Sequence, residues 1–326
     1  MVMGDIATTL PAYFGLQGIT ATKERGYFLC KTEKGITKIY KTEEHHQLIC
    51  LRHEILCQLD AAGFPWTDQI ILSAQGMPYV QFGRETYVMS QHVQGRDINF
   101  DCPQDIALAI QSLANFHVAA RKISQDKIIN VEVSPSLGEI FEKNLAFLTK
   151  IVKQTNKNSR LSDFDVVLLK SISKYINYVT ESALLLKETD YASLYNAAVA
   201  QNHLCHNTLK EESLPILRGR CYITNFSEVT IDAQVVDLAN LLHRYARRSQ
   251  KGIPLGELLE IYDRISPLPR YAMEVVRAYL IHPWQFIKIV QQYYSKKRGW
   301  TPVAITSRMN TLLDEQKSYD EYLGLE

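Results

Sequence analysis

Residues 202–226, NHLCHNTLKEESLPILRGRCYITNF, contain the pattern that decides the fold. A loop around His206 comes first, followed by an apolar run from Leu214 and a β-like stretch that begins at Cys221. That stretch ends at Asn225 and Phe226, and no Asp or Glu lies between Leu214 and Ser227. The sequence predicts one short β-hairpin at about residues 214–224, in a loop region without a carboxylate.

The composition is that of an ordinary globular protein. The chain has 326 residues, is 46% hydrophobic and 22% charged, and carries a net charge of +1. It is long enough for two domains or one two-lobed domain. The balanced charge gives no reason to expect nucleic acid or an anionic membrane as a partner. MVMGDIATTL lacks the features of a signal peptide, and no apolar run approaches the ~20 residues of a membrane span.

Cysteine and histidine spacing favours no metal centre. Six cysteines show neither CxxC spacing nor a small-domain disulfide framework, which favours reduced thiols: Cys30, Cys50, Cys57, Cys102, Cys205 and Cys221. His45, His46 and His53 cluster without the cysteine or carboxylate neighbours of a typical zinc site. We interpret them as the solvated start of a helix, with a metal site as the alternative.

The first hundred residues predict a small sheet and one helix. Residues 27–31 and 36–41 flank a short loop ending in Gly35, which favours a β-hairpin. Residues 43–62 have a helical apolar period closed by Gly63. Residues 70–72, 79–81 and 86–89 resemble further short strands.

After Gly95 the pattern changes to long helices. Apolar residues follow a helical period in DIALAIQSLANFH and over 137–153, 161–187, 235–248 and 255–265. The predicted fold is therefore α+β, with a small antiparallel β-sheet lobe at residues 1–92 and a large, mainly helical lobe at 93–326. A hinge is expected near residues 90–95.

That order of motifs resembles the aminoglycoside phosphotransferase and choline kinase-like superfamily, whose fold is protein-kinase-like. Within it, the chain is most similar to the spore-coat branch, the CotS-type proteins of endospore formers. The resemblance covers most of the chain and rests on six motifs in order: LDAAGF (59–64), YVMSQHVQGRDI (87–98), LANFH (113–117), LCH (204–206), VVDLANLLHR (235–244) and HPWQF (282–286).

The resemblance implies a catalytic loop that has lost its reactive groups. Phosphoryl transfer needs positioned metal ions, a base near the acceptor and a cation on the phosphates. With His206 at the family histidine, Thr208 takes the place of the catalytic Asp and Ser213 that of the metal-binding Asn. A hydroxyl does not accept a proton as a carboxylate does near pH 7.

The remaining metal and phosphate positions are also changed. The resemblance places Asn225 at the second metal-binding Asp, and an amide carries no charge to hold Mg²⁺. The strand lysine falls on Tyr40, although Lys38 on the same strand face or the adjacent Lys41 could still supply a cation. Glu54 is a candidate to orient such a lysine, the alternative being a solvent-facing helix residue.

Two framework residues are retained. The resemblance gives Asp237 a role in bracing the catalytic-loop backbone, and a helix-start cap would be equally structural. His206 is expected to support its loop. Carboxylates elsewhere could in principle substitute for the lost ones, and the candidates are Glu211, Glu212, Glu228 and Asp232.

The adenine-binding hinge of such a fold maps to Met89, Gln91 and Val93. We expect a cleft between Ile39 and residues 222–224. The chain's own side chains are expected to fill it, and Tyr40 is the first candidate. A solvated cleft with Lys38 or Lys41 reaching Glu54 would instead favour retained nucleotide binding.

A positioned general base contributes about 10²–10⁴-fold to a rate, and the charged metal ligands contribute more. The sequence therefore predicts a non-catalytic pseudokinase of the bacterial spore coat, with coat proteins as partners and no cofactor. Location in the mother-cell cytoplasm and then the coat comes from the resemblance alone. The alternatives are an ATP- and Mg²⁺-dependent kinase of a small hydroxylated or amino-sugar acceptor, and a module that binds a nucleotide or glycan without turnover.

Overall fold

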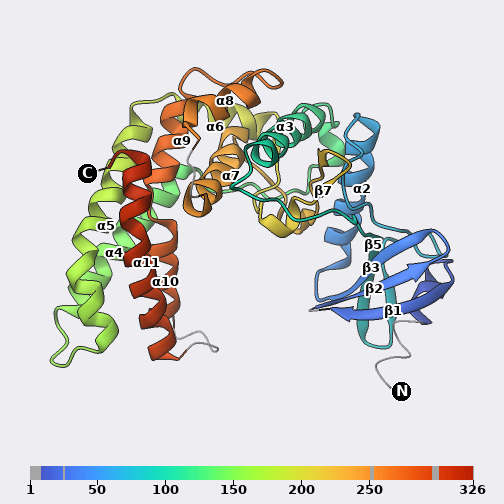
Figure 1. Ribbon diagram of the computed structural model, residues 1–326, viewed down its shortest axis with the longest axis horizontal. Coiled ribbons are helices and arrows are strands. Elements are labelled where there is room, and N and C mark those ends of the chain that lie inside the picture. The colour runs from blue at the N-terminus through green and yellow to red at the C-terminus, as the bar shows by residue number, and fades with distance from the viewer. Residues whose placement is uncertain (1–8, 25, 250–252, 296–300, 326) are drawn as a thin grey trace. The chain divides into compact units, whose positions relative to one another are not determined.

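The computed structural model describes residues 9–24, 26–249, 253–295 and 301–325 (Figure 1). The chain forms two compact units: unit 1 contains Met1–Glu132, Gln201–Ile231 and Glu260–Pro267, and unit 2 contains Val133–Ala200, Asp232–Leu259 and Leu268–Glu326. The boundary predicted after residue 92 stays a prediction. The first eight residues, on which much of the signal-peptide prediction rests, lie outside the described part of the chain.

Unit 1 contains the predicted antiparallel sheet. Its five strands have the order β1-β2-β3-β5-β4, with β1 at Gly18–Glu24, β2 at Tyr27–Thr32, β3 at Gly35–Thr42, β4 at Val80–Phe82 and β5 at Glu85–Gln91. Strands β2 and β3 form the predicted hairpin, and each neighbouring pair is antiparallel. The strand predicted at 70–72 is wrong: Ile70 makes only an isolated bridge to Ser90. The loop that contains Ile70 therefore borders the sheet at a single point.

Alternation along the central strands separates a core face from a polar face. Ile39 pairs with Met89 across β3 and β5, and both side chains are fully buried in a cluster with Leu10 and Phe14. Fully burying one such side chain stabilises the fold by about 1.5–3 kcal/mol. Because successive side chains of a strand point to opposite faces, Lys38 and its cross-strand partner Ser90 lie on the other face.

Helix α2 (His46–Ala61) follows β3, as predicted for residues 43–62. His45 is its N-cap, and the His45 side chain accepts a hydrogen bond from the Gln47 amide. Of the apolar period in the sequence, Ile55 and Leu59 are buried, whereas Leu48 is exposed and Ile49 lies in the core instead. Helix α3 (Pro103–Ala120) begins with Pro at its first turn, a position where the missing amide costs nothing.

Short strands hold the 202–226 segment in unit 1. The predicted hairpin consists of β7 (Ile216–Leu217) and β8 (Arg220–Cys221), while β6 (Leu204–Cys205) pairs with β9 (Thr230–Ile231). Arg96 exchanges two backbone hydrogen bonds with Ile216, of 2.8 and 3.0 Å. A Cβ at Gly95 would lie 2.8 Å from the Ile216 carbonyl oxygen, so this approach requires glycine. The QGRD part of the sequence motif thus docks the hairpin.

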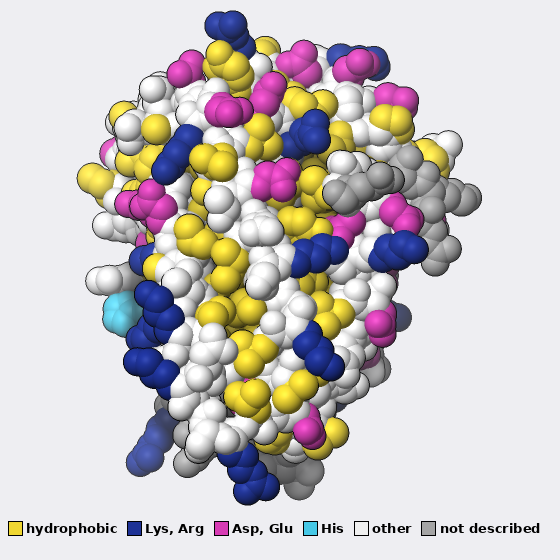
Figure 2. Space-filling view, turned by 90° about the vertical axis from the view of Figure 1, so that its left-hand side faces the viewer, with side chains coloured by type: hydrophobic (Ala, Val, Ile, Leu, Met, Phe, Trp, Pro, Cys, Tyr) yellow, Lys and Arg dark blue, Asp and Glu magenta, His cyan; other side chains and the backbone are white. Residues whose placement is uncertain are grey.

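Unit 2 is helical. It contains α4 (Leu137–Thr155), α5 (Asp163–Lys187), α6 (Tyr191–Ala200), α7 (Gln234–Arg248), α9 (Ala272–Ile281), α10 (Trp284–Tyr294) and α11 (Pro302–Leu323), and α8 (Leu255–Asp263) crosses the boundary between the units. Capping boxes at Ser136 and Ser162 start α4 and α5. Its core stacks Tyr175 on Phe286, with ring centroids 3.7 Å apart. Figure 2 shows this part of the molecule from the side, with hydrophobic side chains among the polar ones.

Candidate functional site

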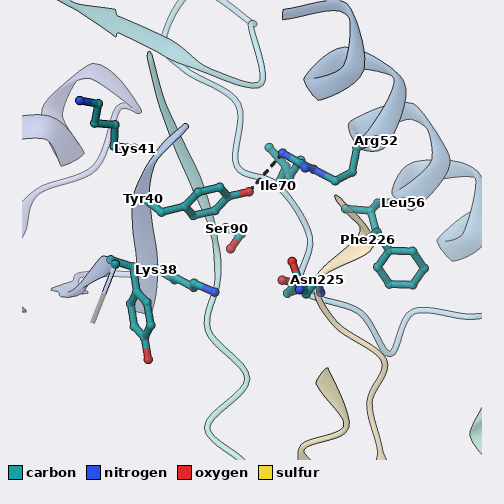
Figure 3. Close-up of a pocket in the computed structure, with 12 residues that line it drawn as sticks. Lys38, Tyr40, Lys41, Arg52, Leu56, Ile70, Ser90, Asn225 and Phe226 are labelled. Atoms are coloured by element: carbon teal, nitrogen blue, oxygen red, sulfur yellow. Dashed lines mark hydrogen bonds between the residues drawn. The ribbon is translucent and has the colours of Figure 1, made fainter. Parts of the chain in front are cut away.

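A small polar pocket lies in unit 1 against the polar face of the sheet, and its volume is about 170 Å³ (Figure 3). Strand β3 contributes Lys38 and Tyr40, β5 contributes Ser90, and α2 contributes Arg52. Asn225 lines the pocket from the loop after β8. Lys41 also lines the pocket, so the structure brings together four of the predicted site residues with others, among them Arg52 and Ser90, that the sequence analysis did not single out.

Tyr40 lies where the resemblance places the strand lysine, and Arg52 of α2 lies beside it in the pocket. The Arg52 guanidinium donates a hydrogen bond of 3.2 Å to the Tyr40 hydroxyl oxygen and two, of 3.0 and 2.8 Å, to the Glu44 carboxylate. The Arg52 side chain is buried. Burial raises the pKa of Tyr40 to about 12, so the phenol keeps its proton at neutral pH.

The other lysine candidates have different partners. Lys41 forms an ion pair with Glu85 at 2.6 Å, and Figure 3 shows its ammonium turned away from Tyr40. Glu54 accepts a hydrogen bond from Gln58 and pairs with Lys127 at 3.3 Å. The ion pair of Glu54 with Lys38 or Lys41 that would favour nucleotide binding is therefore not formed. Lys38 also lines the pocket, and its ammonium lies 4.7 Å from the Tyr27 ring centre and 5.5 Å from that of Tyr40.

Asp68 is a pocket residue that sequence reasoning missed. Its carboxylate accepts a hydrogen bond of 3.1 Å from the backbone amide of Asn225. Burial raises the pKa of Asp68 to about 6, although this hydrogen bond and the charges of Lys38 and Arg52 act in the opposite direction. An Asp in a loop is an ordinary turn residue, and only the folding of this loop onto Asn225 distinguishes it.

Asn225 lies in the left-handed region at φ 66° and ψ 60°, where Asn and Asp are the most tolerated residues with a side chain. Its side-chain oxygen accepts a hydrogen bond of 3.2 Å from Ser227. The side chain is exposed and borders the pocket, so the position is accessible to a ligand. The predicted strand over 222–224 is absent, because β8 ends at Cys221.

The catalytic-loop positions are used to hold the loop together. His206 is fully buried, and its Nε2 lies 2.9 Å from the Thr224 carbonyl oxygen. Ser213 is also buried; its hydroxyl donates to the Lys210 carbonyl at 2.7 Å and accepts from the Lys210 amide at 2.8 Å. The Thr208 hydroxyl oxygen is buried without a hydrogen-bond partner in the structure. The Ser213 hydroxyl is therefore used within its own loop.

The hinge candidates are engaged by the chain itself. Met89 is buried in the core, and its carbonyl accepts a hydrogen bond of 2.8 Å from Ile71. The Gln91 amide donates to Gln69 at 2.9 Å, although the Gln91 side chain is exposed, and Val93 is partly buried. Ile39 points into the core rather than into the pocket.

The candidate substitute carboxylates lie elsewhere. Glu211, Glu212 and Glu228 occupy two short 3-10 helices and are not among the described residues that line the pocket. In unit 2, burial raises the pKa of Asp232 to about 7, and its carboxylate accepts the Ala233 amide. Asp237 is buried in the first turn of α7, where the helix dipole favours a carboxylate. The N-cap of α7 is Ala233, so the alternative that Asp237 caps the start of the helix is wrong.

The clustered histidines have local partners. His46 stacks on Tyr79, with ring centres 4.1 Å apart, and lies 3.1 Å from the Thr86 hydroxyl. His53 lies beside the Cys57 thiol on the next turn of α2.

Nothing in the described part of the chain is a helix both long and apolar enough to span a membrane.

Similar structures are phosphotransferases. An aminoglycoside phosphotransferase from Alicyclobacillus acidocaldarius has a TM-score of 0.79 at 18% identity, covering 94% of this chain and 91% of that one. AMP-bound spectinomycin phosphotransferase APH(9)-Ia gives 0.72 at 10% identity, with 99% and 98% covered. Choline kinase from Cryptosporidium parvum gives 0.50 at 13%, with 94% and 90% covered. At these identities the likeness establishes the fold alone, and it confirms the predicted kinase-like architecture.

No curated protein matches the sequence. The family model described as "Spore coat putative kinase YutH" matches residues 7–325, which is nearly the whole chain and agrees with the spore-coat resemblance. The fold, the motif order and this match together show that the chain belongs to that spore-coat kinase-like family.

Proposed function

We propose that this protein is a component of the bacterial spore coat that has a kinase fold without phosphoryl-transfer activity, and that it acts by binding. The family supports the coat assignment, with coat proteins as partners and a path from the mother-cell cytoplasm to the coat. The main support for the loss of activity comes from the catalytic loop. Its Ser213 hydroxyl is buried and hydrogen-bonded to the backbone of the loop.

The size of the pocket supports the same proposal. Typical sites for drug-sized ligands have volumes of about 300–1,000 Å³. The Tyr40 ring and the Arg52 side chain leave about 170 Å³, which is small for a nucleoside triphosphate. The Met89 carbonyl and the Gln91 amide, which belong to the predicted adenine-binding segment, already have partners in the chain.

The charges in the pocket also differ from those of a phosphotransferase. Mg²⁺ sites in proteins rely on one or two carboxylates together with substrate phosphates. Asp68 is the one carboxylate among the described residues that line this pocket, and it accepts a backbone amide. We therefore expect neither Mg²⁺ nor ATP to act as a cofactor.

Isothermal titration calorimetry with ATP, with and without Mg²⁺, together with a phosphotransfer assay on amino-sugar and choline-like acceptors, tests this function. We expect no Mg²⁺-dependent tightening and no transfer. Micromolar, metal-dependent ATP binding that is lost in Lys38→Met but kept in Lys34→Met would contradict the proposal. Lys34 is a suitable control because it is exposed in the turn between β2 and β3.

Asp68 is the observation that favours the alternative function, an ATP-dependent kinase of a small hydroxylated acceptor with a displaced carboxylate. Its carboxylate lies next to Asn225, where the resemblance places the metal-binding Asp. Under that alternative, Asp68→Asn abolishes transfer while the protein remains folded. Transfer by the wild type together with its loss in this variant would establish the kinase.

A further inference from the structure

The pocket contains buried hydrogen-bond donors without a partner in the chain. The Ser90 side chain is 2% exposed, and its hydroxyl has no hydrogen-bond partner in the structure. The same is true of Nε of Arg52, a residue that is 6% exposed. Buried polar atoms are almost always paired, so two such atoms on residues that line one cavity point to a hydrogen-bond partner that the chain itself does not supply.

The geometry of the sheet aims these donors at one space. Lys38 and Ser90 are directly opposite each other on β3 and β5, and Tyr40 lies two residues along on the same face of β3. Figure 3 shows the ammonium of Lys38 and the hydroxyls of Ser90 and Tyr40 bordering a common space opposite Asn225. The Tyr40 oxygen accepts a hydrogen bond from Arg52, which leaves the phenol proton available to donate.

The donors and acceptors of the pocket are unequal in number. Lysine and arginine side chains only donate hydrogen bonds, and neutral hydroxyl groups can also donate. Against these donors stands the Asp68 carboxylate, which already accepts the Asn225 amide. A ligand that supplies several acceptor oxygens around one centre would satisfy the set, and charge-assisted bonds of this kind are the strong ones.

We infer that this pocket binds a small oxyanion of the size of phosphate or sulfate, without nucleotide or metal. The available 170 Å³ holds several water-sized groups but is below the usual range for larger ligands. This inference rests on the proposed function, since it assumes that the nucleotide chemistry of the cleft is lost. The oxyanion is either a free ion or the terminal group of a phosphorylated or sulfated molecule.

Asp68 sets the conditions under which the oxyanion binds. Its ionised carboxylate repels an anion, and the Glu44 carboxylate, paired with Arg52 at 2.8 Å, offsets much of the charge of that residue, so Lys38 from β3 supplies the main attraction. Burial and the charge of Lys38 lower the pKa of His92, which is not among the described residues that line the pocket. Binding is therefore tighter at pH 5 than at pH 8. Asp68→Asn removes most of this difference by tightening binding at neutral pH.

Calorimetry in a buffer free of phosphate and sulfate tests the inference, with inorganic sulfate, inorganic phosphate and pyrophosphate as probes and with ATP in the presence and absence of Mg²⁺. Sulfate keeps its charge between pH 5 and 8, so any pH effect on its binding comes from the protein. We expect sulfate and phosphate to bind in a one-to-one ratio without metal. Ser90→Ala and Lys38→Met should each weaken binding by about tenfold or more, because a hydrogen bond to a charged group is lost.

Lys34→Met is the matched control, since it removes the same charge from an exposed turn. Equal weakening by Lys34→Met and Lys38→Met would reduce the effect to long-range attraction and overturn the inference, as would the absence of binding by the folded wild type. Stronger binding of a phosphomonoester or sulfate ester than of the free ion would show that the oxyanion is the terminal group of a phosphorylated or sulfated molecule. Mg²⁺-dependent ATP binding would contradict the proposed function, and the sulfate titration decides the oxyanion site independently.

Discussion

The Asp68→Asn substitution should stabilise the protein at neutral pH. The folded state raises the pKa of this carboxyl from 3.8 to about 6, mainly through burial. At 1.36 kcal/mol per pKa unit, ionised Asp68 costs about 3 kcal/mol of stability at pH 8. Asn has nearly the same shape and still accepts the Asn225 amide, so the variant avoids most of that cost. We expect a gain of about 1–3 kcal/mol in the free energy of unfolding at pH 8.

The gain should depend on pH in a defined direction. Between about pH 4 and pH 6 the folded protein binds more protons at Asp68 than the unfolded chain does, so the stability of the wild type falls as pH rises through this window. Below about pH 3 both states are protonated and the difference between wild type and variant disappears.

Urea unfolding followed by intrinsic fluorescence across this pH range measures both effects, with Trp66 reporting close to the substitution in sequence. Asp60→Asn, at an exposed position near the end of α2, is the control and should change little. The reasoning is refuted if Asp68→Asn is less stable than the wild type at pH 8. That result would mean that the attraction of Lys38 and Arg52 outweighs the cost of burial.

Three further predictions follow from the site. Thr208→Asp combined with Asn225→Asp should create a divalent-ion site, so that Mg²⁺ or Mn²⁺ at 100 times its dissociation constant stabilises the double variant by roughly 2.7 kcal/mol in thermal melts. Identical metal responses of wild type and variant would show that these are not the inherited positions. Ser213→Ala should destabilise unit 1 by about 1–3 kcal/mol, because loop backbone groups lose their partner, and chemical denaturation would measure it. Arg52→Met should cost about 3–5 kcal/mol by leaving Glu44 partly buried without its cation, and Arg52→Met with Glu44→Gln should recover part of that loss; no recovery would contradict the pairing.

The kinase-like fold was predictable from the sequence because its signals are local. The β2–β3 hairpin, helix α2 and the long helices of unit 2 each follow from apolar periodicity and turn residues within a short stretch. The errors fall where pairing is short. Residues 70–72 have strand composition but make one bridge, and residues 222–224 continue past the end of β8. The amides of Ile71, Tyr222 and Thr224 do bond to backbone carbonyls, but outside the regular ladder of a strand, and composition does not specify that ladder.

By itself the sequence determined which reactive residue types are missing, since Thr208 and Asn225 carry no carboxylate wherever the chain places them. Only the tertiary structure decided what fills the space. Arg52 is separated from Tyr40 by 12 residues, and Asp68 from Asn225 by 157, yet each pair is joined by a hydrogen bond. Such contacts depend on how a loop and a helix pack against a sheet, and residue type and local spacing do not encode that packing. The charge of the pocket, and therefore the ligand it takes, is a property of the fold.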